Sequence, residues 1–392
     1  MAIRNFDLAW FNQTMQNLGD SQITLKKTQY DKPRHRAGKL INEDKKRVGT
    51  KGDMYTKQIL DLILQKGTID INPRPVYKDF YEGAKYNSTK RVVITKDNQE
   101  IYLSPNDQVK EKENGVEVWV PAHTISVNNG VECTYDLARG ESPLITLRPI
   151  ATKASFAEIL WIYQQQSNDL VKFDELLGRC TWNEDGIIHN WWEEWALRNE
   201  DGSYTLNSEG HPTIGTCYGE TVRRRNFVYD LIENLKKNPF GRRQIVDMWQ
   251  VDDFKEKHGL KPCAYNTTWN IRYERDGEYY LDMTLSQRSS DFATAGCINQ
   301  AQYVALLTMV AKEVGVNPGR FTWKPVNIQI YDRHIPQAIE LLDREPITCN
   351  PKITLPENKS FADLQPDDVQ VVDYPKQLIK ERNPQLKFEL GI

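Results

Sequence analysis

The sequence lacks several features that mark whole classes of protein. No run of about 18 apolar residues occurs along its 392 residues, which argues against a transmembrane helix. The segment 1–16 alternates charged and aromatic residues and has no apolar core of the kind that a secretory signal peptide needs. We therefore expect a soluble protein with no membrane partner and a cytoplasmic location, in the infected host if the chain is viral.

Cysteine is scarce and irregularly spaced. The six cysteines are Cys133, Cys180, Cys217, Cys263, Cys297 and Cys349. They form no CxxC pair, which argues against a zinc site and a disulfide framework, so we expect no metal. In a reducing compartment most such thiols act as small apolar residues, and composition leaves open which of them, if any, is a nucleophile.

An excess of positive charge is also missing. The chain carries 51 Lys and Arg against 54 Asp and Glu, a formal net charge of −3, and its basic residues are dispersed. A nucleic-acid partner held by its phosphates is therefore not expected, and small-molecule chemistry is favoured. With 39% hydrophobic residues the chain can build a sizeable core, as two or three domains or as one elaborated α/β domain.

Local patterns predict a mixture of helices and strands after a polar, basic-rich extension over 1–50. Apolar periodicity predicts helices over 54–64, 155–166, 222–237, 301–314 and 335–342. Alternation and turn residues predict short strands and hairpins within 91–120, a strand over 244–249, a hairpin over 269–285 and a strand over 326–331. The prolines around Arg74 favour an extended segment, and 182–219 is expected to be an aromatic-rich loop with short helical pieces.

Cys263 is the first candidate for chemistry. It follows Lys261 and Pro262 at a loop-to-strand junction that opens the predicted hairpin, which is an unusual place for a thiol that only fills a core. A thiolate there, with its pKa lowered by a nearby arginine, would be a nucleophile. The alternative is a structural thiol at the edge of a strand.

Two arginine-containing segments suggest an anionic ligand. Arginine captures oxyanions in bidentate fashion, and serine hydroxyls add donors to the same phosphate. The segments are Gly241-Arg242-Arg243 and Gln287-Arg288-Ser289-Ser290-Asp291. Ordinary ion pairing at the surface explains a single arginine pair equally well, so position alone leaves both interpretations open.

An amide and an acid complete the candidates. Asn299 precedes the long apolar helix, where its side chain could cap the helix or read a heterocycle, since its paired donor and acceptor match O4 and N3–H of uracil. Glu158 lies on an apolar helical stripe, and is either a solvated residue or a buried acid suited to proton transfer.

Taken in order, these segments resemble the thymidylate synthase and pyrimidine hydroxymethylase superfamily over residues 155–355. Glu158-Ile159-Leu160-Trp161 resembles the family's helical motif, whose acid manages protons and water. Trp192 and Trp195 resemble the aromatic segment beside the folate, and Tyr218 resembles the tyrosine that follows it and belongs to the catalytic set. The resemblance also places Glu158 and Asp291 beside the folate.

The same resemblance implies a nucleotide site shared between two subunits. Pro262-Cys263 resembles the nucleophile motif, and Arg242 with Arg243 resembles the pair that reaches the nucleotide phosphate of the neighbouring subunit, which implies a homodimer. Segment 287–291, comprising Gln287, Arg288, Ser289, Ser290 and Asp291, resembles the family's phosphate and base loop. Asn299 resembles the pyrimidine-reading amide, and Tyr331 the tyrosine that touches the sugar 3′-hydroxyl.

Three departures separate this chain from typical synthases. Ala264 follows the nucleophile where synthases usually carry His, and Gln329 replaces His before Tyr331. The flexible arginine loop is absent, with Arg74 as its substitute. These features are similar to phage deoxyuridylate hydroxymethyltransferases. The implied fold is α/β, with a large mixed sheet packed at a dimer interface and flanked by helices, and residues 51–392 form the catalytic domain.

The activity that this resemblance implies is a dUMP hydroxymethyltransferase that uses 5,10-methylenetetrahydrofolate and water through a covalent adduct between Cys263 and C6. The main alternative is a thymidylate synthase, which completes the reaction with hydride from the folate. A dCMP hydroxymethylase and a non-catalytic nucleotide- or RNA-binding module are further alternatives. A thiol hydrolase would need a histidine partner, and His258 lies only five residues upstream of Cys263.

Overall fold

The structure is a computed structural model that describes residues 48–69, 124–274, 277–331 and 334–388, together with the backbone of five short strands between them. Most of the predicted extension 1–50, the extended segment 72–76 and Arg74 lie outside the described residues. The predicted strands within 91–120 are confirmed and form two small antiparallel sheets, the first of which also contains a strand before residue 91. These comprise β2 (Lys85–Asn87), β3 (Val92–Ile94), β4 (Glu100–Tyr102), β5 (Val109–Glu113) and β6 (Val116–Val120).

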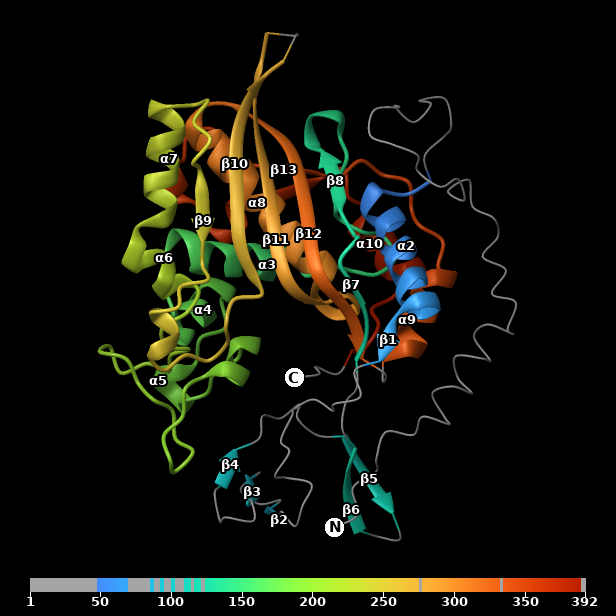
Figure 1. The fold of residues 1–392 in the computed structure, drawn as a ribbon, viewed down its shortest axis with the longest axis vertical. Coiled ribbons are helices and arrows are strands. Elements are labelled where there is room, and N and C mark those ends of the chain that lie inside the picture. Colours follow the sequence, from blue (N-terminus) through green and yellow to red (C-terminus); the bar gives the residue numbers. More distant parts are fainter. Residues whose placement is uncertain are drawn as a thin grey trace.

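A large mixed sheet organises the molecule (Figure 1). Its order is β1-β7-β12-β11-β10-β9, with β8 also paired to β12; β11 and β12 run parallel, and the other pairs are antiparallel. The strands are β1 (Thr68–Ile69), β7 (Thr124–Asn128), β8 (Cys133–Asp136), β9 (Ile245–Asp247), β10 (Ala264–Tyr273), β11 (Tyr279–Asp291) and β12 (Asn317–Tyr331). The sheet confirms the mixed α/β fold predicted from the resemblance.

The helices cover the sheet and its ends. Figure 1 shows α3 and α8 behind the long strands, α6 and α7 at the β9 edge, and α2 and α9 at the opposite edge. The helices are α2 (Lys51–Lys66), α3 (Thr152–Ile159), α4 (Leu170–Leu177), α5 (Trp182–Asp185), α6 (Gly219–Arg225), α7 (Phe227–Lys237), α8 (Cys297–Val314), α9 (Ile335–Asp343) and α10 (Lys376–Arg382). A separate two-stranded sheet joins β13 (Lys352–Thr354) to β14 (Gln370–Val372).

The core lies between the sheet and α8. Thirteen residues of this helix between Cys297 and Ala311 are buried, and the exceptions in this span are Ile298 and Asn299 near its start. The helix is buried because it crosses between the parallel strands β11 and β12 and packs on both. On β11, Leu281, Met283 and Leu285 alternate with partly exposed residues, so one sheet face is buried and the other keeps polar side chains at its surface.

The pairing register of the sheet brings the start of β10 and the ends of β11 and β12 close together. Ala264, which opens β10, pairs with Gln287 of β11, and Asp291 at the end of β11 pairs with Gln329 of β12. Gln329 in turn pairs with Ser126 of β7. The carboxyl ends of adjacent parallel strands are a usual place for ligands in α/β sheets, and here Cys263 joins them from the antiparallel neighbour.

Several predicted elements differ in extent. The helix predicted over 155–166 ends as α3 and continues as a π-helical turn, Leu160–Gln164. The helix predicted over 222–237 is two helices, since Asn226 adopts a left-handed conformation with φ of 49° between α6 and α7. The hairpin and the last predicted strand are longer than expected. Polar residues that alternate outward along β10, β11 and β12 interrupt the apolar pattern, so the sequence predicts strands that are too short.

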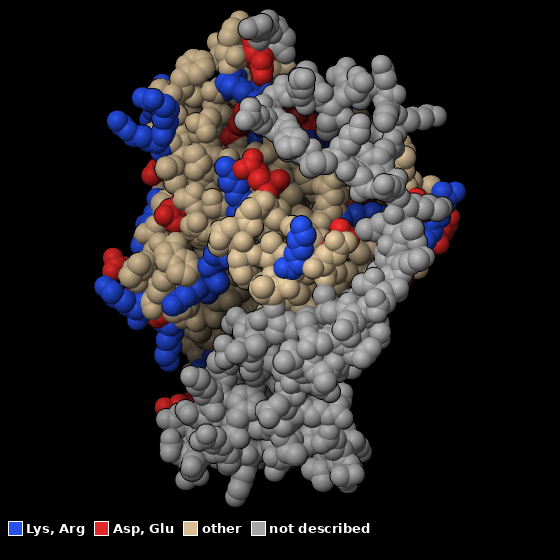
Figure 2. All heavy atoms as spheres, turned by 45° about the vertical axis from the view of Figure 1, so that its right-hand side comes forward, with Lys and Arg blue, Asp and Glu red and all other residues tan. Residues whose placement is uncertain are grey.

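The charged residues are mixed on the surface. Figure 2 shows Lys and Arg interspersed with Asp and Glu on the described part of one face, without a broad field of one sign. Within the described residues, none of the helices combines the length and apolar character that a membrane crossing requires.

Candidate active site

A cavity of about 950 Å³ lies at the strand ends and gathers most of the predicted site residues. Thirteen of them line it: Glu158, Trp192, Trp195, Tyr218, Cys263, Gln287, Arg288, Ser289, Ser290, Asp291, Asn299, Gln329 and Tyr331. They come from α3, the 3-10 turn Trp191–Trp195, the start of α6, and the ends of β10, β11, β12 and α8. Tertiary folding therefore brings together residues that are up to 173 positions apart in the sequence.

Hydrogen bonds at both its N–H and its carbonyl hold the backbone of Cys263 in place. Its N–H donates to Tyr218 Oη at 3.1 Å, and its carbonyl accepts from the N–H of Arg288 at 2.9 Å. The Arg288 guanidinium donates from Nε to the Pro262 carbonyl at 2.9 Å and from Nη2 to the Lys261 carbonyl at 2.8 Å. These bonds fix the turn that precedes β10, and they leave the Cys263 thiol facing the cavity.

The expectation that a nearby arginine lowers the pKa of the Cys263 thiol below its ordinary value is wrong. Burial raises this pKa, and the opposing effects of the Arg288 charge and the Tyr218 hydroxyl only partly offset the burial. Arginine is near the thiol as predicted, but desolvation outweighs it. Formation of the thiolate is therefore tied to what else enters the cavity, such as an additional charge or a proton acceptor.

Tyr218 takes a strained conformation to reach the nucleophile turn. Its φ is 46° and its ψ −110°, which a non-glycine residue rarely adopts, and it directly precedes α6. The next residue must be small, since a Cβ on Gly219 would lie 2.0 Å from the Ser167 carbonyl oxygen. The Tyr218 ring packs against Trp192 with centroids 4.9 Å apart, so the same strain positions one wall of the cavity.

Glu158 is a buried acid, which agrees with the second of the two interpretations from the sequence and excludes a solvated residue. It lies in the last turn of α3, directly before the π-helical turn, and lines the cavity. Burial raises its pKa from 4.5 to about 7, while the polar side chains of Gln302, Trp192 and Trp191 partly oppose this rise. A carboxyl that titrates near neutral pH can both accept and donate a proton, which suits general acid–base chemistry.

Asp291 closes the other side of the cavity. Burial raises its pKa to about 6, against the opposing effects of Thr294 and Arg148. Its side chain accepts a hydrogen bond from the Thr294 N–H at 3.4 Å, so it caps the π-helical turn Phe292–Gly296 that leads into α8. Ser289 Oγ donates to Gln329 Oε1 at 3.4 Å, which links the end of β11 to β12.

Asn299 does not cap α8, since the residue at the helix start is Gly296. Its Oδ1 instead accepts a hydrogen bond from Gln287 Nε2 at 3.2 Å, and its Nδ2 donates to Gln302 Oε1 at 3.1 Å. The side chain therefore faces the cavity as part of a hydrogen-bonded group of amides, and the capping interpretation is wrong.

The cavity offers polar atoms that the described chain leaves without partners. Trp192 Nε1, Ser290 Oγ and Gln302 Nε2 are buried, line the cavity and have no hydrogen-bond partner among the described residues. Buried polar groups in folded proteins are nearly always satisfied, so this arrangement fits a polar ligand. The large aromatic surfaces of Trp192 and Trp195 suit a flat ring system beside it.

Arg242 and Arg243 are not part of this cavity. Both side chains are exposed on the turn between α7 and β9, and the described cavity wall does not include them. The structure therefore separates this arginine pair from Cys263 within one subunit.

Comparison with known proteins identifies the relatives of this chain. A family model described as "Thymidylate synthase" matches residues 100–385. A thymidylate synthase of Lactococcus lactis subsp. cremoris is 36% identical over 345 residues, which cover 88% of this chain and 100% of that protein. One from Streptococcus agalactiae is 42% identical over 266 residues, covering 67% and 85%.

The chain belongs to the thymidylate synthase family.

Solved structures agree with this family assignment. The thermostable thymidylate synthase A of Bacillus subtilis superposes with a TM-score of 0.61 at 24% identity, covering 87% of this chain and 99% of that one, which shows the shared fold. Thymidylate synthase from T4 phage gives a TM-score of 0.54 at 26% identity, covering 74% and 96%. Members of this family are folate-dependent one-carbon transferases that bind dUMP and 5,10-methylenetetrahydrofolate and act as homodimers.

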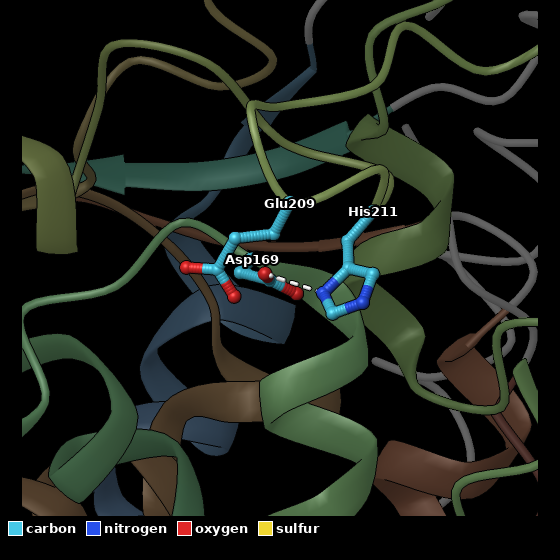
Figure 3. A group of neighbouring side chains, drawn as sticks. All are labelled: Asp169, Glu209 and His211. Atoms are coloured by element: carbon cyan, nitrogen blue, oxygen red, sulfur yellow. Dashed lines mark hydrogen bonds and ion pairs between the residues drawn. The ribbon is translucent and has the colours of Figure 1, made fainter.

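A second cluster of ligating side chains, Asp169, Glu209 and His211, has a structural explanation (Figure 3). Asp169 Oδ1 accepts from the N–H groups of Val171 and Lys172 at 2.9 and 3.1 Å and so caps α4. Its Oδ2 lies 2.8 Å from His211 Nδ1, and Glu209 accepts from Lys172 Nζ at 2.6 Å. Helix capping and ion pairing account for all three side chains.

Sequence reasoning missed several residues of the cavity. Gln302 is the clearest case, since a glutamine inside the apolar run of α8 is a polar residue on a buried helix, which is a readable signal. Trp191 and Ser126 also line the cavity. Trp191 belongs to the predicted aromatic-rich segment without being singled out there, and Ser126 carries no local pattern. Their positions follow from the fold of the 3-10 turn and from the register of β7, which only the tertiary structure gives.

Proposed function

We propose that this protein is a thymidylate synthase that converts dUMP to dTMP, with 5,10-methylenetetrahydrofolate as co-substrate. The observation that carries the proposal is the cavity that brings the Cys263 thiol, the Glu158 carboxyl and the Asn299 amide together. The proposal is supported by relatives of 36% and 42% identity that are named thymidylate synthase. These names favour a thymidylate synthase, which was the main alternative in the sequence analysis. The main prediction there, a dUMP hydroxymethyltransferase, is not confirmed.

The chemistry assigns a separate task to each residue. The Cys263 thiolate adds to C6 of the uracil ring, and the displaced electron pair moves through C5 to O4. Asn299 donates and accepts hydrogen bonds at the ring edge where this charge develops. Glu158 moves protons at the ring carbonyl and at C5, and expulsion of Cys263 restores the C5–C6 double bond. The folate supplies the one-carbon unit and, for a synthase, the hydride that reduces it.

The remaining predicted contacts follow the shape of the site. Arg288, Ser289 and Ser290 suit the nucleotide phosphate, while Gln329 and Tyr331 suit the sugar. On the other wall, Trp192, Trp195 and Asp291 suit the folate. Arg242 and Arg243, exposed in one subunit, suit the phosphate of the partner's site in a homodimer. We assign residues 51–392 to the catalytic domain.

A product assay tests the proposal directly. The protein is incubated with dUMP and 5,10-methylenetetrahydrofolate, and nucleotides and folates are analysed by mass spectrometry. We expect dTMP and dihydrofolate in equal amounts, because the hydride leaves tetrahydrofolate oxidised. Formation of 5-hydroxymethyl-dUMP with tetrahydrofolate would instead support the hydroxymethyltransferase. Turnover of dCMP in place of dUMP, or no turnover of either nucleotide, would overturn the proposal.

A further inference from the structure

A chain of hydrogen bonds runs from the core to the cavity. The indole Nε1 of Trp323 donates to Gln287 Oε1 at 2.8 Å. Gln287 Nε2 donates to Asn299 Oδ1 at 3.2 Å, and Asn299 Nδ2 donates to Gln302 Oε1 at 3.1 Å. Trp323 is fully buried in the middle of β12 and does not line the cavity, whereas the three amides do.

The direction of this chain is set at Gln287, which has two partners that cannot exchange donor for acceptor, the Trp323 indole and the Ser289 carbonyl. A side-chain amide can rotate by a half-turn and exchange its donor for its acceptor with little change in shape, but an indole N–H can only donate. Gln287 must therefore turn its oxygen toward Trp323, which leaves its nitrogen to donate to Asn299. The same nitrogen also donates to the Ser289 backbone carbonyl at 3.0 Å, and because a carbonyl can only accept, this bond supports the same orientation. The bond to Asn299 in turn sets the Asn299 oxygen on the Gln287 side and its nitrogen on the Gln302 side.

The last amide of the chain faces the acid. Because Gln302 Oε1 accepts from Asn299, its Nε2 points the other way, and this nitrogen has no hydrogen-bond partner among the described residues. The Gln302 side chain is nevertheless close enough to Glu158 to influence the carboxyl. The orientation fixed at Gln287 thus extends through Asn299 and Gln302 to the acid–base residue.

The hydrogen bonds that Asn299 makes within the protein decide which pyrimidine base its amide can recognise. With one lone pair of Oδ1 engaged by Gln287 and one proton of Nδ2 engaged by Gln302, the amide keeps one acceptor and one donor for a ligand. In a fixed orientation these two sites match N3–H and O4 of uracil. After a half-turn they would match N3 and the 4-amino group of cytosine instead.

We propose that Trp323 is a specificity-determining positioning residue. Together with the Ser289 carbonyl, its buried indole N–H fixes the amide orientation of Gln287 and through it that of Asn299, and so selects uracil over cytosine. This inference rests on the proposed function, because it takes a pyrimidine nucleotide as the ligand of Asn299. Trp323 touches no substrate. It acts through Gln287, and its effect is on the choice between two bases rather than on affinity in general.

Replacing the indole with a ring that cannot donate tests the inference. In Trp323→Phe the aromatic ring stays in the core beside Phe292, whose centroid lies 5.9 Å from that of Trp323, but the donor is lost. Binding of dUMP and of dCMP is measured separately by calorimetry. We expect the ratio of their Kd values, which favours dUMP in the wild type, to fall by about tenfold or more, with weaker dUMP binding and stronger dCMP binding.

Trp269 supplies a matched control. It is also a buried tryptophan of the same sheet, on β10, and its indole Nε1 donates to Thr267 Oγ1 at 2.9 Å, away from the cavity. Trp269→Phe therefore removes an equivalent buried donor, and we expect it to leave the dUMP-to-dCMP ratio unchanged. If Trp323→Phe weakens both nucleotides equally, as Trp269→Phe would through general destabilisation, the inference is wrong.

A double-mutant cycle tests whether Trp323 acts through Gln287, and it does so even if Trp323→Phe also has other effects on the protein. Gln287→Met removes the next link of the chain without touching Trp323, and we expect it to lower the same ratio. Adding Trp323→Phe to Gln287→Met should then change the ratio no further, since the link is already absent. Independent effects of the two substitutions on the ratio would overturn the inference, and so would an unchanged ratio in Gln287→Met.

Failure of the proposed function gives a different result. A wild-type protein that binds neither nucleotide, or that prefers dCMP, contradicts the proposed function and with it the inference. A wild type that prefers dUMP, combined with a Trp323→Phe ratio equal to that of the wild type, contradicts the inference alone.

Discussion

Glu158 is expected to reduce the stability of the folded protein at the pH where it works. Its pKa is about 7 in the folded protein against an ordinary value of 4.5, because burial disfavours the charged form. Below about pH 4.5 the carboxyl is protonated in both states and has no such cost. As the pH rises to about 7 the unfolded chain ionises first, so folding loses stability across this range and the loss is complete above it.

The size of the effect follows from the difference between the two pKa values. At about 1.36 kcal/mol for each pKa unit, the ionised Glu158 costs the folded state about 3 kcal/mol above pH 7. Glu158→Gln keeps the shape of the side chain and cannot ionise. We therefore expect this variant to be more stable than the wild type by up to about 3 kcal/mol at about pH 8, while the two converge as the pH approaches 4.5.

Urea denaturation followed by tryptophan fluorescence measures this difference. Wild type and Glu158→Gln are compared at about pH 5 and pH 8 and at one protein concentration, because the stability of a dimer depends on concentration. The same variant should lose most of its turnover, since it has no proton to move. Equal stability at pH 8, or a variant that is less stable there, would refute the reasoning.

Glu233 provides the control for this experiment. It is exposed on α7, and its hydrogen bond with Lys237 at 2.8 Å lowers the pKa of its carboxyl. The direction of its shift is opposite to that of Glu158, so Glu233→Gln should give no gain in stability at pH 8. A gain of similar size in both variants would assign the effect to net charge rather than to burial.

Three further predictions concern the reaction. Cys263→Ser should lower kcat/KM for dUMP on the order of a thousandfold or more in a steady-state assay, and retained activity would exclude the covalent adduct. Arg288→Lys loses its bonds to two carbonyls of the nucleophile turn, so KM for dUMP should rise and kcat fall by about tenfold, whereas an unchanged kcat would contradict the positioning role. If the Arg242 and Arg243 pair serves the partner's site, mixing an inactive double alanine variant of this pair with inactive Cys263→Ser subunits should restore about a quarter of wild-type activity, and no recovery would place the pair elsewhere.

Much of the site could be predicted from the order of short motifs. Cys263, Arg288 and Asn299 were each ambiguous alone, but their order along the chain pointed to one family and to one cavity, which the structure describes. The electrostatics were less predictable. The rise in the pKa of Cys263 depends on how completely the fold removes water from the thiol, and a sequence with Arg288 nearby favours the opposite direction.

The predicted ends of helices and strands were wrong where the backbone conformation changes but the residue types along the chain do not. Asn226 ends α6 and begins α7 through one left-handed residue, and the π-helical turn after Glu158 has no signature that periodicity could detect. On β12 the polar residues that alternate outward, such as Arg320 and Thr322, hid a strand that begins at Asn317. Pairing with β11 on one side and with β8 and β7 on the other keeps this strand extended.

The amino-acid sequence alone shows which residue types are available: a thiol, an acid, an amide and an arginine in a recognisable order. It contains no CxxC pair or cationic tract to suggest another chemistry. The tertiary structure decided how these groups are protonated and oriented. Burial sets the pKa of Glu158, and the indole of Trp323, which is far from Asn299 in the sequence, helps to set the direction of a chain of amides. Both effects depend on distance and solvent exclusion in three dimensions, and these are properties of the packed chain rather than of any local pattern.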